Sequence, residues 1–167
     1  MKRLLALVLA TLATPAIGEP LKVLETQTFV GLLNPDGTEE IRQATAFPLI
    51  PARVCYGWRI RLGGNNKLVK ATEVFTLPGS PQDWGDIESD QFSPTKLSAD
   101  RKTSTTTQFY TPEGGWIQHQ WCVAPGDPAG KYVMSVSSDD QPLGTFEPTA
   151  QAVAPDQNAG PPAPPAP

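Results

Sequence analysis

The sequence predicts an all-β domain built as an antiparallel sandwich. Short stretches rich in β-branched and aromatic residues alternate with clusters of proline, glycine, aspartate and asparagine, which is the pattern of strands and tight turns. No window carries the apolar period of an amphipathic helix. The 167 residues include 19 prolines and 14 glycines. We therefore expect seven or eight short strands joined by turns.

Two of the expected strands carry especially clear signals. β-Branched and aromatic residues fill 21–33, and the Asn34-Pro35-Asp36-Gly37 sequence that follows has the composition of a type I turn. From 54 to 62, apolar side chains occupy alternate positions, which predicts a strand with one buried face. The other predicted strands are 39–47, 68–77, 103–110, 116–123, 131–137 and a short last strand ending at 146.

A long irregular segment interrupts this pattern from 78 to 102. It is too polar for a core strand and longer than an ordinary connection. We expect an acidic solvated loop, with a weak cation site or a partner contact as alternatives, although the spacing does not fit a helix-flanked calcium loop. Large aromatics outside strands are enriched at contact surfaces. The candidate contact residues are Trp84 and the four carboxylates around it, Asp83, Asp86, Glu88 and Asp90.

The N-terminus has the form of a secretory signal peptide. Met-Lys-Arg is followed by an apolar run from Leu4 to Ala10 and a small-residue exit, which predicts cleavage after Gly18. The apolar run is too short to span a bilayer, and no later segment is long enough to do so. No cysteine follows the run to accept a lipid. The sequence therefore predicts a soluble protein of the periplasm or the exterior.

The charge balance argues against some classes of partner. The chain carries 13 basic and 17 acidic side chains, a net charge of −4 with its one histidine neutral. Removal of Lys2 and Arg3 with the signal peptide would make the mature protein more acidic still. We therefore expect neither nucleic acid nor an anionic membrane surface as partner.

Two cysteines, Cys55 and Cys122, lie in the predicted exported part, where an oxidising compartment lets disulfides persist. They permit only one intramolecular pairing, and we expect that disulfide. Two buried free thiols or an intermolecular link are the alternatives. Neither cysteine has the Cys-x-x-Cys spacing of a redox or zinc site.

The C-terminal segment differs in composition from the rest of the chain. Seven of the 19 prolines lie in 148–167, with alanine, glutamine and glycine between them. Such a segment cannot bury enough apolar surface to offset its ordering entropy. We therefore divide the chain into a signal peptide (1–18), a sandwich domain (19–149) and a disordered Pro/Ala-rich tail (150–167).

The sequence offers no convincing catalytic motif. Ser93 and Lys96 match a Ser-x-x-Lys pair, but the companion elements of serine enzymes with that motif are absent, and a turn or cap explains the serine more simply. His119 is the only histidine, so a His-rich metal site is excluded by count, and a structural role is expected for it. We expect no enzyme activity, no metal and no cofactor.

Three segments carry a family resemblance. They are the aromatic strand Cys55-Tyr56-Gly57-Trp58-Arg59-Ile60-Arg61, the strand end Thr76-Leu77-Pro78, and Pro125-Gly126-Asp127-Pro128-Ala129-Gly130-Lys131-Tyr132 before a strand that turns at Asp139-Asp140. The part from 21 to 149 resembles bacterial exported immunoglobulin-like domains, in particular the family catalogued as domain of unknown function 3859. The resemblance implies an immunoglobulin-like sandwich and no mechanism.

These observations favour an exported, non-enzymatic binding or accessory module whose partner is a protein or another envelope component. An inhibitor of a secreted hydrolase and a structural envelope component tethered by the proline-rich tail are the alternatives. If the acidic loop does not bind, the exposed edge strands are the next candidate surface, because they can pair with a partner's backbone without any side-chain signature.

Overall fold

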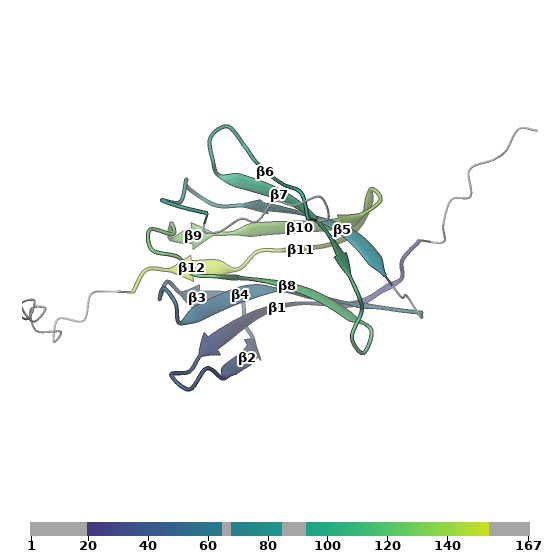
Figure 1. Cartoon of the computed structure of the whole chain (residues 1–167), viewed down its shortest axis with the longest axis horizontal. Coiled ribbons are helices and arrows are strands. Elements are labelled where there is room, and N and C mark those ends of the chain that lie inside the picture. The colour runs from purple at the N-terminus through teal and green to yellow at the C-terminus, as the bar shows by residue number, and fades with distance from the viewer. Residues whose placement is uncertain (1–19, 65–67, 85–92, 154–167) are drawn as a thin grey trace, which may run out of the picture.

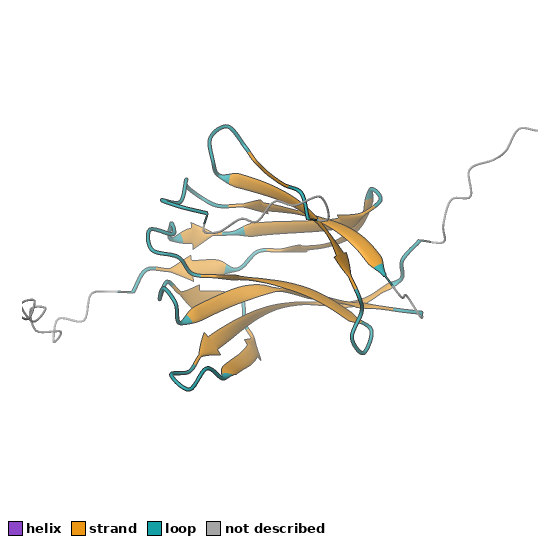
Figure 2. Cartoon of the chain, in the orientation of Figure 1, coloured by secondary structure: helices purple, strands orange, loops and turns teal. Residues whose placement is uncertain are grey.

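Two β-sheets face one another in this protein (Figure 1). The computed structural model describes residues 20–64, 68–84 and 93–153. Within these ranges the regular elements are all strands, and turns or loops connect them (Figure 2). The predicted all-β sandwich is confirmed.

The first sheet has four strands in the order β2-β1-β4-β8. Its members are β1 (Val23–Leu33), β2 (Glu39–Gln43), β4 (Val54–Leu62) and β8 (Trp116–Cys122), and every neighbouring pair is antiparallel. The predicted reversal between β1 and β2 is present, since the N–H of Gly37 donates to the carbonyl of Asn34 at 3.0 Å.

The second sheet has five strands in the order β11-β10-β5-β7-β6. Its members are β5 (Val69–Thr76), β6 (Thr95–Leu97), β7 (Thr103–Tyr110), β10 (Val133–Ser138) and β11 (Gln141–Phe146). Asp139 and Asp140 connect β10 to β11 with positive φ angles of 44° and 67°, as expected for a two-residue hairpin turn. A third, small sheet joins β3 (Ala46–Pro48), β12 (Thr149–Gln151) and β9 (Gly130–Lys131).

The structure corrects the predicted element list in three places. The expected strand 39–47 is two strands, because the chain leaves β1 after Gln43 and β3 pairs with β12 instead. The segment 78–102 is not wholly irregular, since it contains β6, which pairs with β7. Residues 150 and 151 belong to β12 rather than to the tail. With β9, which is separate from β10 where one strand 131–137 was expected, these short strands raise the number in the described ranges to twelve.

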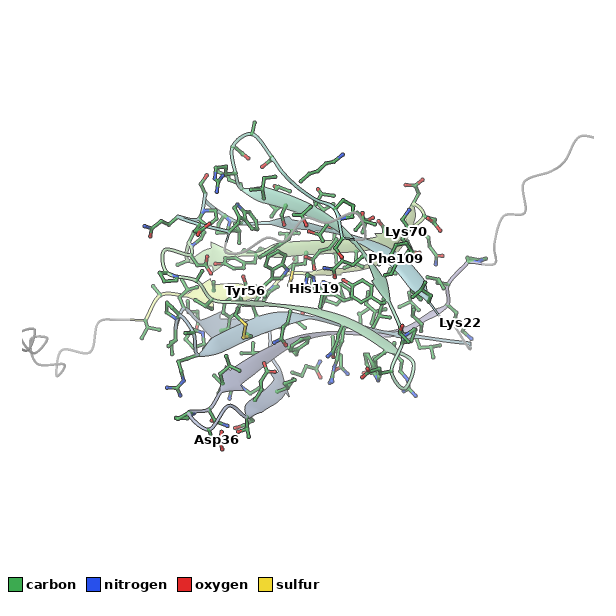
Figure 3. All side chains as sticks on the ribbon, viewed as in Figure 1. Lys22, Asp36, Tyr56, Lys70, Phe109 and His119 are labelled. Atoms are coloured by element: carbon green, nitrogen blue, oxygen red, sulfur yellow. A yellow bond between two sulfur atoms is a disulfide. The ribbon has the colours of Figure 1, made fainter. Side chains whose placement is uncertain are left out.

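The core is unusually rich in aromatic rings. Phe47 stacks on Tyr56 with ring centroids 4.1 Å apart, and Tyr132 meets both rings edge-on. Further along, Trp58 stacks on Phe146 of the opposite sheet at 5.9 Å. All these rings are at most 4% exposed, and each contributes on the order of 2 kcal/mol by burial alone. Figure 3 shows Tyr56 and His119 between the sheets, in the same layer.

The predicted disulfide is confirmed. Cys55 of β4 lies directly opposite Cys122 of β8, and the two are bonded. Alternation along β4 turns Tyr56 and Trp58 towards the core, so Cys55 lies on the outer face of the sheet. The bond therefore links neighbouring strands of one sheet, and it fixes the C-terminal end of β8 to β4.

Candidate functional site

Several predicted features lie outside the described residues. They are the signal peptide, Asp86, Glu88 and Asp90 of the acidic loop, and residues 154–167 of the tail. Of the candidate contact residues, the structure describes only Asp83, which is exposed, and Trp84.

Trp84 occupies a different place from the one expected of an exposed anchor. It is 8% exposed, and its ring lies against Phe75 and Trp121. Its indole N–H donates to the carbonyl of Arg101 at 2.8 Å, so the polar atom of the ring is also satisfied inside the fold. Trp84 is a core residue that covers one end of the aromatic cluster, which corrects the expectation that it is available to a partner.

The lone histidine belongs to a buried polar cluster that the sequence analysis missed. Glu73 of β5 is 2% exposed, and its carboxylate accepts the indole N–H groups of Trp58 and Trp121, the latter at 2.9 Å. His119 of β8 places Nδ1 3.4 Å from the same carboxylate. A buried carboxylate is tolerated only when its oxygens accept hydrogen bonds. The two indoles supply them, whereas the buried Nδ1 of His119 lies beside the carboxylate without a hydrogen-bond partner. The ring of His119 packs edge-on or tilted against Trp58 and Trp121, which fits the structural role expected for it.

The charge of Glu73 also acts on its surroundings. Burial, and then the negative charge of Glu73, hold the pKa of Tyr110 above its ordinary value. The hydroxyl of Tyr110 donates to Oε1 of Gln108 at 2.9 Å. No oxygen or sulfur nucleophile is hydrogen-bonded to His119 within the described ranges.

Other chemical possibilities find no support in the part of the chain that is described. Lys96 lies in a strand, so the helical spacing that would bring a Ser-x-x-Lys pair together is not present at Ser93. Residues 20–64, 68–84 and 93–153 contain no group of three histidine, cysteine or acidic side chains that could hold a metal ion. No helix in these ranges is long and apolar enough to cross a membrane.

The free edge of β8 is the most distinctive surface feature. Leu62 donates to Gly115 at 2.8 Å and Val123 donates to Val54 at 2.8 Å, which places the odd-numbered residues of β8 in the hydrogen-bonded pairs with β4. In an antiparallel ladder the residues between such pairs point their N–H and C=O groups the other way. Those groups of Gln118, Gln120 and Cys122 therefore face outward, and among the described strands none lies beside β8 on that side.

The other outer strands carry protective features that β8 lacks. Unpaired edges are normally protected by charge, proline, bulges or short length. β2 bears Glu39, Glu40 and Arg42, β6 has only three residues, and β11 contains Pro142 beside a register shift. β8 has seven residues without a charged side chain or proline, and its ladder with β4 runs without a register shift.

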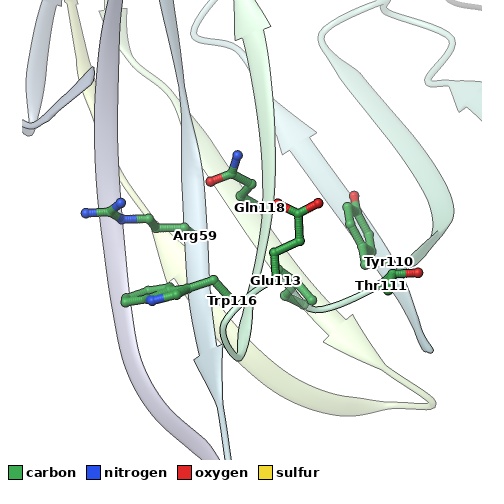
Figure 4. Close-up of a pocket in the computed structure, with 7 residues that line it drawn as sticks. Arg59, Tyr110, Thr111, Glu113, Trp116 and Gln118 are labelled. Atoms are coloured by element: carbon green, nitrogen blue, oxygen red, sulfur yellow. The ribbon is translucent and has the colours of Figure 1, made fainter. Parts of the chain in front are cut away.

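A shallow hollow of about 340 Å³ adjoins the first residues of β8 (Figure 4). Arg59 and Trp116 lie on one side of the strand, with the guanidinium 5.0 Å from the ring centroid, while Tyr110 and Thr111 lie on the other. Arg59 also donates through Nε to Gln27 at 2.6 Å. These contacts hold the start of β8 in place beside a depression that a neighbouring side chain could enter.

Comparisons with known proteins agree with this architecture. The profile of the PM0630 beta sandwich domain family matches residues 28–150. The crystal structure of an immunoglobulin-like protein, PA1606 from Pseudomonas aeruginosa, is similar with a TM-score of 0.55 and 13% sequence identity, covering 81% of this chain and 100% of that chain. No curated protein matches the sequence.

These matches support the immunoglobulin-like sandwich that the sequence resemblance implied. The narrower resemblance, to domain of unknown function 3859, is not confirmed, because the matching profile belongs to another family description. At 13% identity the structural neighbour supports the fold alone.

Proposed function

The chain belongs to the PM0630 beta sandwich domain family, and we propose that it is an exported, non-enzymatic binding module that pairs an extended segment of a partner protein with the free edge of β8. The unprotected edge of β8 carries this proposal. Strand addition uses main-chain hydrogen bonds for affinity, so it needs no catalytic or charged motif on the receiving strand.

The chemistry of β8 suits an extended segment. Its outward amides belong to residues whose side chains are uncharged, so an incoming chain meets no buried charge. The hollow at Trp116 and Gln118 lies where a side chain of the added strand would project. The disulfide at Cys122 and the stacking of Arg59 on Trp116 hold both ends of β8, which lowers the entropy cost of binding.

Two observations support the remaining parts of the proposal. The charged start, apolar run and small-residue exit at 1–18 support export, and a disulfide persists most readily in an oxidising compartment. A non-enzymatic role is supported by the single histidine, whose imidazole lies beside a carboxylate that two indoles already occupy.

The test compares two substitutions at one residue. Gln118→Pro removes the outward N–H without breaking a bond to β4, whereas Gln118→Ala changes only the side chain. The wild type and both variants would be immobilised and exposed to envelope extract, and captured proteins would be quantified by mass spectrometry. We expect one partner to be lost with Gln118→Pro and retained with Gln118→Ala.

The folded state of each variant would be checked by thermal unfolding before capture. Equal capture by a folded Gln118→Pro variant would exclude β8 as the binding edge. A matched control is Ile41→Pro at the opposite edge of the same sheet. The backbone N–H of Ile41 points away from β1, so its loss breaks no hydrogen bond to that strand. Its capture should equal that of the wild type.

A further inference from the structure

The sequence of β8 has an approximate mirror symmetry about its central residue. His119 lies at the centre, with Gln118 and Gln120 on either side of it. Beyond them lie Ile117 and Trp121, both of which point towards the core. Reading the strand in either direction therefore gives nearly the same order of polar and apolar positions.

An antiparallel strand with this pattern can pair with a second copy of itself. With His119 on the two-fold axis, Gln118 of each copy would lie opposite Gln120 of the other. Those two residues carry outward N–H and C=O groups, so each pair would form both ladder hydrogen bonds. Ile117 would lie opposite Trp121 of the second copy, which matches apolar with apolar.

The charge distribution permits this contact between two like-charged molecules. The whole chain has a net charge of −4, yet β8 contains no aspartate, glutamate, lysine or arginine. The charged strand β2 lies at the far edge of the same sheet. Two copies that meet through β8 would therefore bring no charged side chain of β8 itself to the contact, and the nearest carboxylate of β2, that of Glu39, accepts a hydrogen bond from the side-chain amide of Gln120 at 3.4 Å.

From these observations we infer that, in the absence of another partner, the protein forms a symmetric dimer through antiparallel pairing of β8 with β8 of a second copy. The dimer covers β8, which among the described strands is the long outer strand without protective features, and it joins the two four-stranded sheets into one continuous sheet. A symmetric contact of this kind closes after two subunits and does not propagate into a fibre. The inference uses the same edge as the proposed function, so a bound partner segment and the second copy would compete for it.

Sedimentation across a wide range of protein concentration tests the dimer directly. The full mature protein should pass from monomer to dimer as concentration rises. Gln120→Pro removes one outward N–H from each copy, hence two ladder bonds, and should weaken association by at least about tenfold. Ile41→Pro, at the far edge, should associate as the wild type does.

A second measurement needs no variant. Hydrogen exchange of the wild type should show the amides of Gln118 and Gln120 protected at high concentration and exposed at low concentration. A protein that stays monomeric throughout, or a dimer in which these amides exchange equally at both concentrations, would overturn the inference.

The two proposals fail separately. A monomeric protein whose partner capture still depends on the Gln118 amide would refute the dimer and keep the binding module. A β8-mediated dimer that captures no partner protein would refute the binding module and keep the dimer.

Discussion

Trp121 donates its indole N–H to the carboxylate of Glu73 across the two sheets, with Nε1 2.9 Å from Oε1. Trp58 donates to the other oxygen of the same carboxylate. Three strands, β4, β5 and β8, are therefore joined through one buried side chain. The edge strand that we propose as the binding surface is fixed to the opposite sheet by this hydrogen bond as well as to its neighbour by the disulfide.

Replacing Glu73 with leucine should destabilise the fold strongly, because both indole N–H groups would lose their acceptor inside the core. We expect a loss of at least about 2 kcal/mol in the free energy of unfolding, measured with urea. Glu73→Gln keeps one acceptor oxygen for the indole N–H groups, so its loss in the free energy of unfolding should be smaller. Glu40→Gln, at an exposed site on β2, is the control and should stay within about 0.5 kcal/mol of the wild type. A Glu73→Leu variant as stable as the wild type would show that the hydrogen bonds to Glu73 contribute nothing to the stability of the fold.

Gly57 should be indispensable for the pairing of β4 with β8. A Cβ atom at this position would overlap the carbonyl oxygen of His119 and lie 2.9 Å from Cα of Gln120. Because both obstacles are backbone, they can move only by separating the strands. Gly57→Ala should therefore cost about 1 to 3 kcal/mol or more in thermal or urea unfolding.

Gly79→Ala provides the comparison for Gly57. There the nearest atom to the added methyl group is Cβ of Pro128 at 3.5 Å, an ordinary contact. The free energy of unfolding of Gly79→Ala should therefore match that of the wild type closely. Similar losses in both variants would mean that the close approach at Gly57 is not the cause.

The three tyrosines predict how stability changes in alkaline solution. Burial is the leading reason that the pKa values of Tyr56, Tyr110 and Tyr132 are raised above their ordinary value. Above about pH 10 the unfolded chain releases phenolic protons that the folded chain retains. The free energy of unfolding should therefore be unaffected by these groups below that pH and fall above it, by up to about 1.4 kcal/mol per pH unit for each tyrosine.

Tyrosinate absorbance during an alkaline titration would check this expectation. The absorbance should rise together with the loss of the folded state rather than before it. Tyr110→Phe should make the decline of stability with pH less steep. Free titration of all three tyrosines in the folded protein would contradict the burial that the structure gives them.

Much of this fold follows from sequence patterns that are local. The strands at 54–62 and 103–110 begin and end where β4 and β7 do, because alternation and flanking turn residues mark them. The same alternation could have revealed Glu73, which shares its face of β5 with Val69, Ala71 and Phe75. A carboxylate at an apolar position of a strand signals buried partners, even when the partners cannot be named.

The parts that could not be predicted depend on long-range pairing. β12 exists only because β3 and β9 flank it, and three residues alone carry no pattern. The burial of Trp84 depends on the carbonyl of Arg101 and on rings from two other strands. The free edge of β8 is a property of strand order, which no local sequence feature encodes.

Trp84→Ala should therefore act on stability and only indirectly on binding. Removing an indole that lies against Phe75 and Trp121 leaves a cavity and should cost about 3 to 5 kcal/mol. Asp83→Asn, at the exposed neighbouring residue, should leave the melting temperature unchanged. A stable Trp84→Ala protein with weakened partner capture would instead favour a contact role for the acidic loop.

The C-terminal boundary of the folded domain can be tested by two truncations. A chain that ends at Val153 keeps β12, whereas a chain that ends at Glu147 removes it together with Pro148. In the intact protein Tyr132 donates to the carbonyl of Pro148, Leu49 donates to that of Gln151, and Thr149 donates to that of Thr45, each at 2.9 Å. Ala150 is 2% exposed among them.

The shorter chain should lose several kcal/mol, because two buried residues and these main-chain bonds disappear together and leave the Tyr132 and Leu49 amides without their acceptors. The chain ending at Val153 should melt within about a degree of the full-length protein, since residues 154–167 have the composition of a segment that adds no core. Thermal unfolding of both chains, followed by circular dichroism, decides the boundary. Equal melting temperatures for the two truncations would mean that β12 contributes nothing to stability, and a large loss in the longer one would mean that the tail docks on the sandwich.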